Sequence, residues 1–192
     1  KNKINEAEWF LGAQLNYAEN ILRLKDSNKI AIEFFNELGC HETYSYKNFY
    51  SQTSVVVNLF RKLGLNKGDR VAAMMPNIPE TVISSLACSS LGGIWASCSP
   101  DFGENAILDR FKQIKPKILV LCNGYTFKGK EYSCADRLER IISELDSVEH
   151  VILVDYIENK KIENPKCINW NDIKFDAPFK EIGFVQMQFN DP

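Results

Sequence analysis

A short apolar run, Arg70-Val71-Ala72-Ala73-Met74-Met75, opens the most regular part of the sequence. Further runs of the same kind begin near residues 94, 118 and 151, and helix-like segments separate them. The clearest of these segments has apolar residues at positions 138, 141, 142 and 145, the spacing of one helical face. Continuous apolar strands that alternate with helices are typical of a parallel sheet covered on both faces. The sequence therefore predicts an α/β fold, with a parallel sheet flanked by helices.

The helix that follows the first strand carries start and stop signals. Asn77 is the expected N-cap, with Glu80 three residues later and Pro79 in the first turn, where a missing N–H costs little. Gly92-Gly93 is the expected end of this helix, and Pro116 ends the next one.

The chain before residue 70 predicts an extension and a hairpin. Asn16 is the expected N-cap of a first helix, and residues 30–35 and 43–46 read as two strands of a hairpin. A helix over 49–63 follows, ended by Gly64.

The regular pattern ends after Asp155. We expect a surface loop over residues 160–165 and at most a short helical turn over 170–173.

Composition favours an ordinary globular protein. Of 192 residues, 45% are apolar and 25% charged, values that exclude intrinsic disorder. The balance of 23 Lys+Arg against 25 Asp+Glu leaves no basic footprint, so we expect no nucleic-acid partner. No apolar run has the length of a membrane span, and the polar start, residues 1–6, does not resemble a leader, so we expect no membrane association.

Six cysteines show neither a CxxC pair nor a Cys/His cluster. We expect reduced structural thiols and a cytoplasmic protein. Since the sequence lacks an initiator Met, we interpret the chain as a piece of a longer protein.

Ligands of open parallel sheets bind beyond the carboxyl ends of the strands. This rule selects three loops: 76–79, 99–103 and 123–130. In the second, Phe102 has a ring that can stack on a base, and Gly103 opens a helix whose N–H groups can face an anion. The alternative is that Pro100 and Gly103 only turn the chain while Asp101 caps the helix.

In the third loop, Lys128 and Lys130 stand around a flexible Gly129, an arrangement that suits a phosphate group. The alternative is a solvated surface loop. His41 and His150 have no Ser, Cys or Asp partner at a recognisable spacing and are expected at the surface or at strand ends.

Three common motifs are absent from the sequence. It has no GxGxxG after a strand, no GxxxxGK[ST] and no GxSxG, which disfavours dinucleotide dehydrogenases, P-loop enzymes and α/β-hydrolases respectively.

Three stretches together resemble a known family. They are Trp9-Phe10-Leu11-Gly12-Ala13-Gln14-Leu15-Asn16-Tyr17-Ala18-Glu19-Asn20, then Gly68-Asp69-Arg70-Val71 with Pro76-Asn77, and Gly92-Gly93-Ile94-Trp95 through Pro100-Asp101-Phe102-Gly103. They are similar to the N-terminal third of the acetoacetyl-CoA synthetase family, which are acyl-CoA synthetases of the adenylate-forming superfamily. The resemblance implies an N-terminal extension over residues 1–28 and an incomplete α/β portion of the large N-terminal domain over 29–192.

The resemblance also implies an AMP-forming acid–thiol ligase. ATP and acetoacetate, or a similar short acyl acid, form an acyl-adenylate with Mg²⁺ shielding the phosphates, and the thiol of CoA then attacks the activated carbonyl. The implied partners are these small molecules and the remainder of the chain.

The sequence lacks motifs that the family uses for its chemistry. The Ser/Thr/Gly-rich phosphate loop and the catalytic lysine are missing, so no catalytic residue and no metal ligand is assigned, and the chain alone is expected to be inactive. The resemblance implies that part of the CoA site is formed by Phe102, Gly103, Lys128, Gly129 and Lys130.

Two alternatives stay open: a truncated module of the same fold that binds CoA or a protein without catalysis, and an unrelated doubly wound domain. A piece of a larger domain is also expected to expose an apolar face.

Overall fold

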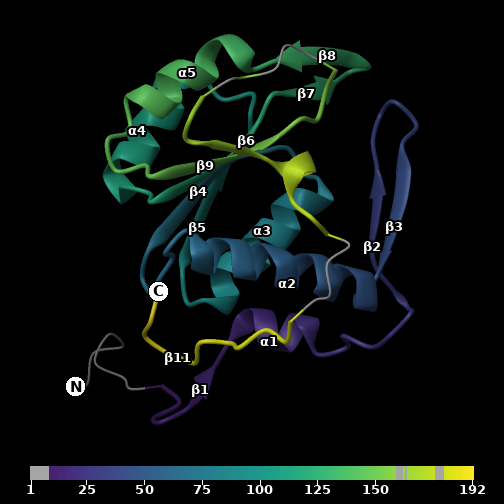
Figure 1. Ribbon diagram of the computed structural model, residues 1–192, viewed down its shortest axis with the longest axis vertical. Helices are drawn as coiled ribbons and strands as arrows, with labels where there is room; N and C mark the ends of the chain where they lie inside the picture. Colours follow the sequence, from purple (N-terminus) through teal and green to yellow (C-terminus); the bar gives the residue numbers. More distant parts are fainter. Residues whose placement is uncertain (1–8, 159–161, 163, 176–179) are drawn as a thin grey trace, which may run out of the picture.

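A five-stranded parallel sheet forms the centre of the molecule (Figure 1). In the computed structural model, the described residues are 9–158, 162, 164–175 and 180–192. The strand order is β10-β9-β6-β4-β5. The strands are β4 (Arg70–Met74), β5 (Ile94–Cys98), β6 (Ile118–Cys122), β9 (His150–Val154) and β10 (Cys167–Asn169). The predicted parallel sheet is therefore confirmed.

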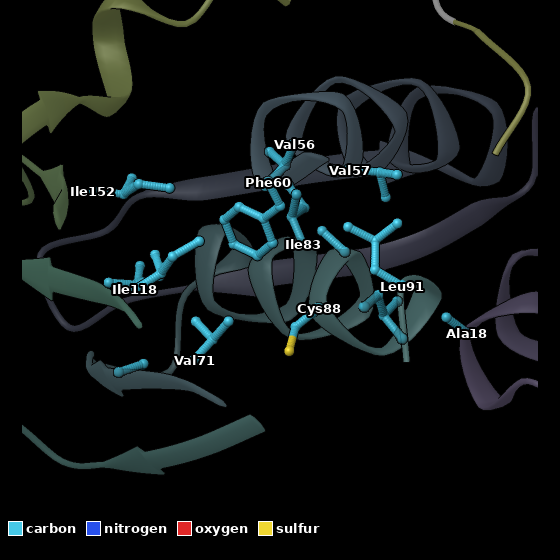
Figure 2. Packing of buried hydrophobic residues seen from close by; sticks show 14 of the residues in the cluster. Ala18, Val56, Val57, Phe60, Val71, Ile83, Cys88, Leu91, Ile118 and Ile152 are labelled. Atoms are coloured by element: carbon cyan, nitrogen blue, oxygen red, sulfur yellow. The ribbon is translucent and has the colours of Figure 1, made fainter. Parts of the chain in front are cut away.

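Helices cover both faces of this sheet (Figure 1). The helices α2 (Tyr46–Lys62) and α3 (Pro79–Ser90) lie on one face, and α4 (Glu104–Ile114) and α5 (Ala135–Ser143) on the other. Successive strand residues alternate between the two cores: Val71 and Ala73 pack with Phe60, whereas Ala72 and Met74 pack with Phe111. Figure 2 shows the first core, where Phe60 lies among Val71, Ile83 and Ile118.

The N-terminal part confirms the expected hairpin and cap. Strands β2 (Ile30–Phe35) and β3 (His41–Ser45) pair antiparallel, and α1 (Tyr17–Leu22) begins at the N-cap Asn16. Strand β1 (Gln14–Leu15) pairs with β11 (Met187–Gln188), which joins the two ends of the described chain.

The expected cap of α3 is wrong. Ile78, not Asn77, occupies the N-cap position, and no side chain caps the helix. The turn is closed instead by the carbonyl oxygen of Pro76, which accepts from the Ile78 N–H at 3.0 Å and the Thr81 hydroxyl at 2.7 Å. Pro79 is the first helical residue, as expected, and Gly92 ends the helix with φ +69°.

The C-terminal part contains a strand that the sequence pattern did not predict. β10 adds parallel to β9, with Ile168 opposite Ile152. It is three residues long and only half-buried, so it lacks the continuous apolar run of the central strands. The expected turn is confirmed as a 3₁₀ turn, η2 (Trp170–Asp172). Half of the loop expected over 160–165, residues 160, 161 and 163, lies outside the described residues.

Apolar side chains are exposed where the two ends of the described chain meet. Phe10 is 69% exposed and its ring lies 5.3 Å from that of Phe189. A cleft of about 500 Å³ opens there, lined in part by Leu15, Tyr17 and Met187. The expected exposed apolar face is found at this place.

Candidate functional site

The carboxyl edge of the sheet is hollowed between the loops that follow β4, β5 and β6. A cleft of about 350 Å³ lies there. This is the edge that the sequence rule for open parallel sheets selects. The lining residues come from all three loops: Pro76, Asn77, Ser99, Pro100, Asp101, Tyr125, Thr126, Phe127 and Tyr132.

A second cleft of about 430 Å³ adjoins the first and shares Pro76, Asn77 and Thr126 with it. Its far side is the β2–β3 hairpin, which contributes residues 34–37. The two clefts therefore lie on either side of the loop after β4.

Phe102 and Gly103 lie beside the first cleft, at the start of α4. The Phe102 ring is 38% exposed, and the Arg110 guanidinium lies 4.8 Å from its centroid. Gly103 occupies the N-cap position of α4, so Asp101 does not cap this helix. A Cβ on Gly103 would meet no atom within 4 Å. Packing therefore does not require a glycine there, and the space above this backbone is open.

The expected flexible loop around Gly129 is instead the tip of a hairpin. Strands β7 (Gly124–Phe127) and β8 (Lys130–Ser133) pair antiparallel, with Phe127 opposite Lys130. Lys128 and Gly129 form the two-residue turn, with φ +52° and +70°, the signs of a type I′ turn. The Gly129 N–H donates to Glu37 Oε2 at 2.6 Å, which joins this tip to the β2–β3 hairpin.

The two predicted sets of residues, 102–103 and 128–130, lie beside the walls of the first cleft. Loop 99–103 forms one wall and β7 the other, and none of the five predicted residues lines the cleft itself. The Lys128 ammonium lies 5.1 Å from the Phe127 ring centroid. Neither Lys128 nor Lys130 forms an ion pair with the residues that the structure describes.

Several residues of this edge were not predicted. The rings of Tyr125 and Tyr132 stack with centroids 5.2 Å apart on facing strands of the hairpin. Arg137, in α5, donates to the carbonyl oxygen of Phe102 at 2.8 Å and also to that of Pro100. The Tyr pair follows from the hairpin register, but Arg137 reaches the loop only through the folded arrangement of α5.

Asn123 and Gly124, part of the third predicted loop, have structural roles. The Asn123 side chain accepts from the N–H groups of Tyr156 and Ile157 and donates to the Ile157 carbonyl, which joins the ends of β6 and β9. A Cβ on Gly124 would lie 2.2 Å from Ile157 Cδ1, so the close approach requires glycine.

The cysteines are free in the structure, as expected, and Cys88, Cys98 and Cys122 are buried. Burial raises the pKa of Cys88 to about 12 and that of Cys98 to about 11. His41 contacts Glu33 Oε1 at 3.0 Å on the exposed β2–β3 hairpin, and His150 begins β9, so both lie where the sequence placed them.

The described residues hold no group of three or more His, Cys, Asp and Glu side chains that could bind a metal ion. No helix in the described part of the chain is long and apolar enough to cross a membrane.

Comparisons with known proteins agree with this architecture. The chain is 38% identical to an acetoacetyl-CoA synthetase of Mus musculus over 165 residues, which cover 84% of this chain and 24% of that protein. It is 33% identical to the enzyme of that name from Caenorhabditis elegans, over 99% of this chain and 28% of that protein. A solved acetoacetyl-CoA synthetase from Streptomyces lividans matches with a TM-score of 0.89 and 32% identity, over 97% of this chain and 28% of that one.

The chain thus spans about a quarter of the length of the curated relatives it matches. A model of the family described as "AMP-binding enzyme" matches residues 23–182, most of the chain and all of the central sheet. The chain therefore belongs to the AMP-binding enzyme family.

Proposed function

We propose that this chain is the N-terminal portion of an ATP-dependent acetoacetate–CoA ligase. The observation that carries the proposal is the match to a solved acetoacetyl-CoA synthetase at a TM-score of 0.89 and 32% identity over 97% of the chain. The division into an extension, 1–28, and an α/β portion, 29–192, belongs to the same proposal, as does a cytoplasmic location.

The proposed reaction has two steps. The carboxylate of acetoacetate displaces pyrophosphate from ATP, and the thiol of CoA then displaces AMP from the acyl-adenylate. Mg²⁺ would shield the phosphate charge. The protein contributes positioning and charge stabilisation.

Within this reaction, the carboxyl edge of the sheet is proposed to hold the nucleotide end of CoA. Phe102 offers an exposed aromatic face beside the open backbone of Gly103. Lys128 and Lys130 lie at the tip of the β7–β8 hairpin, whose strand β7 lines the same cleft, and their positive charges would favour phosphate groups there. The stacked pair Tyr125–Tyr132 supplies an apolar wall between them.

Several carboxylates near this edge oppose anion binding. Asp101 lines the cleft, Glu37 accepts from the tip of the β7–β8 hairpin, and Glu104 lies in the first turn of α4. Glu104 is paired with Arg140 at 2.7 Å, which offsets its charge.

A second candidate is a truncated module that binds CoA or a protein without catalysis. The two candidates share the cleft but differ in chemistry, so activity separates them.

The test uses the natural protein that contains this sequence. Acetoacetate-dependent exchange of pyrophosphate into ATP, followed by CoA-dependent release of AMP, supports the ligase. If calorimetry detects CoA binding but neither reaction occurs, the non-catalytic module is supported. If neither CoA binding nor activity is detected, both candidates are contradicted.

A further inference from the structure

Arg137 joins helix α5 to the backbone of loop 99–103, which forms one wall of the first cleft. Its Nη1 donates to the carbonyl oxygen of Phe102 at 2.8 Å, and its Nη2 donates to the carbonyl oxygen of Pro100. The two accepting residues stand on either side of Asp101, which lines the cleft. One guanidinium group therefore holds the backbone on both sides of a residue of the cleft wall.

The guanidinium group is itself held in place, at a cost. The sulfur of Cys134, which precedes α5, lies 2.9 Å from Nη2 of Arg137. The Nε of Arg137 is buried and has no hydrogen-bond partner among the described residues. A buried donor without a partner lowers stability. Such an arrangement is typical of a residue that serves a site rather than the core.

Loop 99–103 has few other restraints of this kind. In the described part of the chain, no other side chain donates to the backbone carbonyls of residues 100–102. The Phe102 N–H donates to the Ser99 carbonyl oxygen at 3.3 Å, a bond within the loop itself. The position of the loop relative to the sheet and α5 therefore depends on Arg137.

We propose that Arg137 is a positioning residue for CoA binding. Its guanidinium group fixes loop 99–103 so that the Phe102 ring and the open backbone at Gly103 are in place before CoA arrives. This inference rests on the proposed function, in which the same loop contacts the nucleotide end of CoA. A loop that is already ordered loses less conformational entropy on binding, so the contribution of Arg137 is to the affinity for CoA.

The shape of the side chain, and not only its charge, is required for this role. A planar guanidinium presents N–H donors in a fixed fork that can bond two carbonyl oxygens at once. The ammonium group of a lysine keeps the charge but lacks the fork. If the charge of Arg137 instead contacted a phosphate of CoA directly, a lysine would replace it.

The experiment uses the natural protein that contains this sequence, as wild type, Arg137→Met, Arg137→Lys and Arg70→Met. Arg70 is the matched control, because its guanidinium also donates to two carbonyl oxygens, those of Ile114 and Lys115, both at 2.7 Å. Arg70 begins β4 and so lies at the opposite edge of the sheet from the cleft. Two quantities are measured: the KM for CoA, and the hydrogen–deuterium exchange of peptide 99–107 without ligand.

In Arg137→Met the KM for CoA should rise about fivefold or more, whereas acetoacetate-dependent exchange of pyrophosphate into ATP, which needs no CoA, should stay within about twofold of wild type. Peptide 99–107 should exchange faster, because the N–H bonds of Phe102 to Ser99 and of Ile107 to Gly103 open more often. Arg137→Lys should resemble Arg137→Met in both measurements. Arg70→Met should resemble wild type in both.

Four results would overturn the positioning role. They are an unchanged KM for CoA in Arg137→Met, an unchanged exchange of peptide 99–107 in that variant, a wild-type KM in Arg137→Lys despite fast peptide exchange, and an equal rise in KM in Arg70→Met. A wild type that lacks acetoacetate-dependent exchange contradicts the proposed function instead. The peptide exchange, which requires neither substrate nor activity, then decides by itself whether Arg137 holds the loop.

Discussion

The side-chain amide of Asn16 is bonded to the backbone of Val185, at the other end of the described chain. Its nitrogen lies 2.8 Å from the Val185 carbonyl oxygen and 2.8 Å from that of Ser89, at the end of α3. Its oxygen accepts from the N–H of Ala18 at 2.9 Å and so caps α1. Asn16 is 2% exposed, so these bonds are made away from water.

Asn16→Ala should therefore lower the free energy of unfolding by about 2–3 kcal/mol, because it removes a cap and leaves two part-buried carbonyls without this donor. Asn20→Ala is the matched control, since among the described residues the exposed Asn20 side chain accepts only from Arg23, the C-cap of the same helix. Urea unfolding of the two variants measures the difference. Equal stability of the two would contradict this account of Asn16.

Gly124→Ala should destabilise the protein by about 1–3 kcal/mol, because the new methyl group overpacks the core beside Ile157. Ile157→Val in the same chain should relieve only part of this loss, since the Tyr132 carbonyl oxygen also lies 2.7 Å from the new Cβ position. Gly103→Ala, with no atom within 4 Å, should cost less than about 1 kcal/mol. Thermal unfolding that ranks the two glycines in the opposite order would show the close approach to be wrong.

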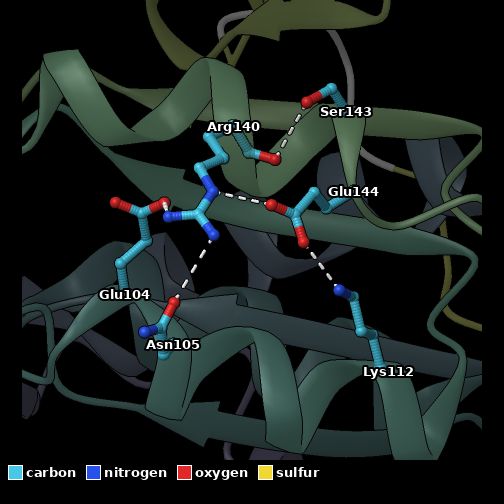
Figure 3. Close-up of polar contacts among 6 residues, drawn as sticks. All are labelled: Glu104, Asn105, Lys112, Arg140, Ser143 and Glu144. Atoms are coloured by element: carbon cyan, nitrogen blue, oxygen red, sulfur yellow. Dashed lines mark hydrogen bonds and ion pairs between the residues drawn. The ribbon is translucent and has the colours of Figure 1, made fainter.

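Arg140 joins α4 to α5 at the surface (Figure 3). Its guanidinium lies 2.7 Å from Glu104 and 2.6 Å from Glu144, and Glu144 also contacts Lys112 at 2.6 Å. Arg140→Met should cause a small loss of stability at low salt that shrinks at high salt, because exposed ion pairs are screened. A loss that is independent of salt would mean that packing of the Arg140 stem, not charge, holds the two helices.

Glu80 should make the folded state less stable as the pH rises, whereas a carboxylate in an ion pair has the opposite effect. Burial raises the pKa of this carboxyl from 4.5, so the folded state favours its protonated form. Stability should fall as the pH rises through 4.5 to the raised folded pKa. Glu80→Gln should therefore be more stable than wild type at pH 7 and match it below about pH 4. A variant less stable than wild type at pH 7 would contradict the burial effect.

The sheet was predictable because β4, β6 and β9 are short apolar runs buried on both faces. The hairpin β7–β8 was not, because every residue of β8 is exposed and the strand has no apolar alternation. Strand β10 was not predictable for a similar reason, because its pairing with β9, and not its composition, makes it a strand.

The candidate site was predictable only as an edge of the sheet. The rule for parallel strands selected the loops that line the cleft, and the aromatic and basic residues followed from residue type. Arg137 was out of reach, because its hydrogen bonds to the carbonyl oxygens of Phe102 and Pro100 join α5 to loop 99–103, and no local pattern encodes these contacts.

The proposed CoA site is tested most directly by the KM for CoA in the natural protein that contains this sequence. In Lys128→Ala/Lys130→Ala, the KM for CoA should rise about tenfold or more, since two charge-assisted contacts are lost, while acetoacetate-dependent exchange of pyrophosphate into ATP stays unchanged. Lys62→Ala/Lys115→Ala is the control, because these exposed lysines lie at the ends of α2 and α4, at the opposite edge of the sheet. An unchanged KM for CoA in the first variant, or an equal rise in both, would contradict the placement of CoA at this edge.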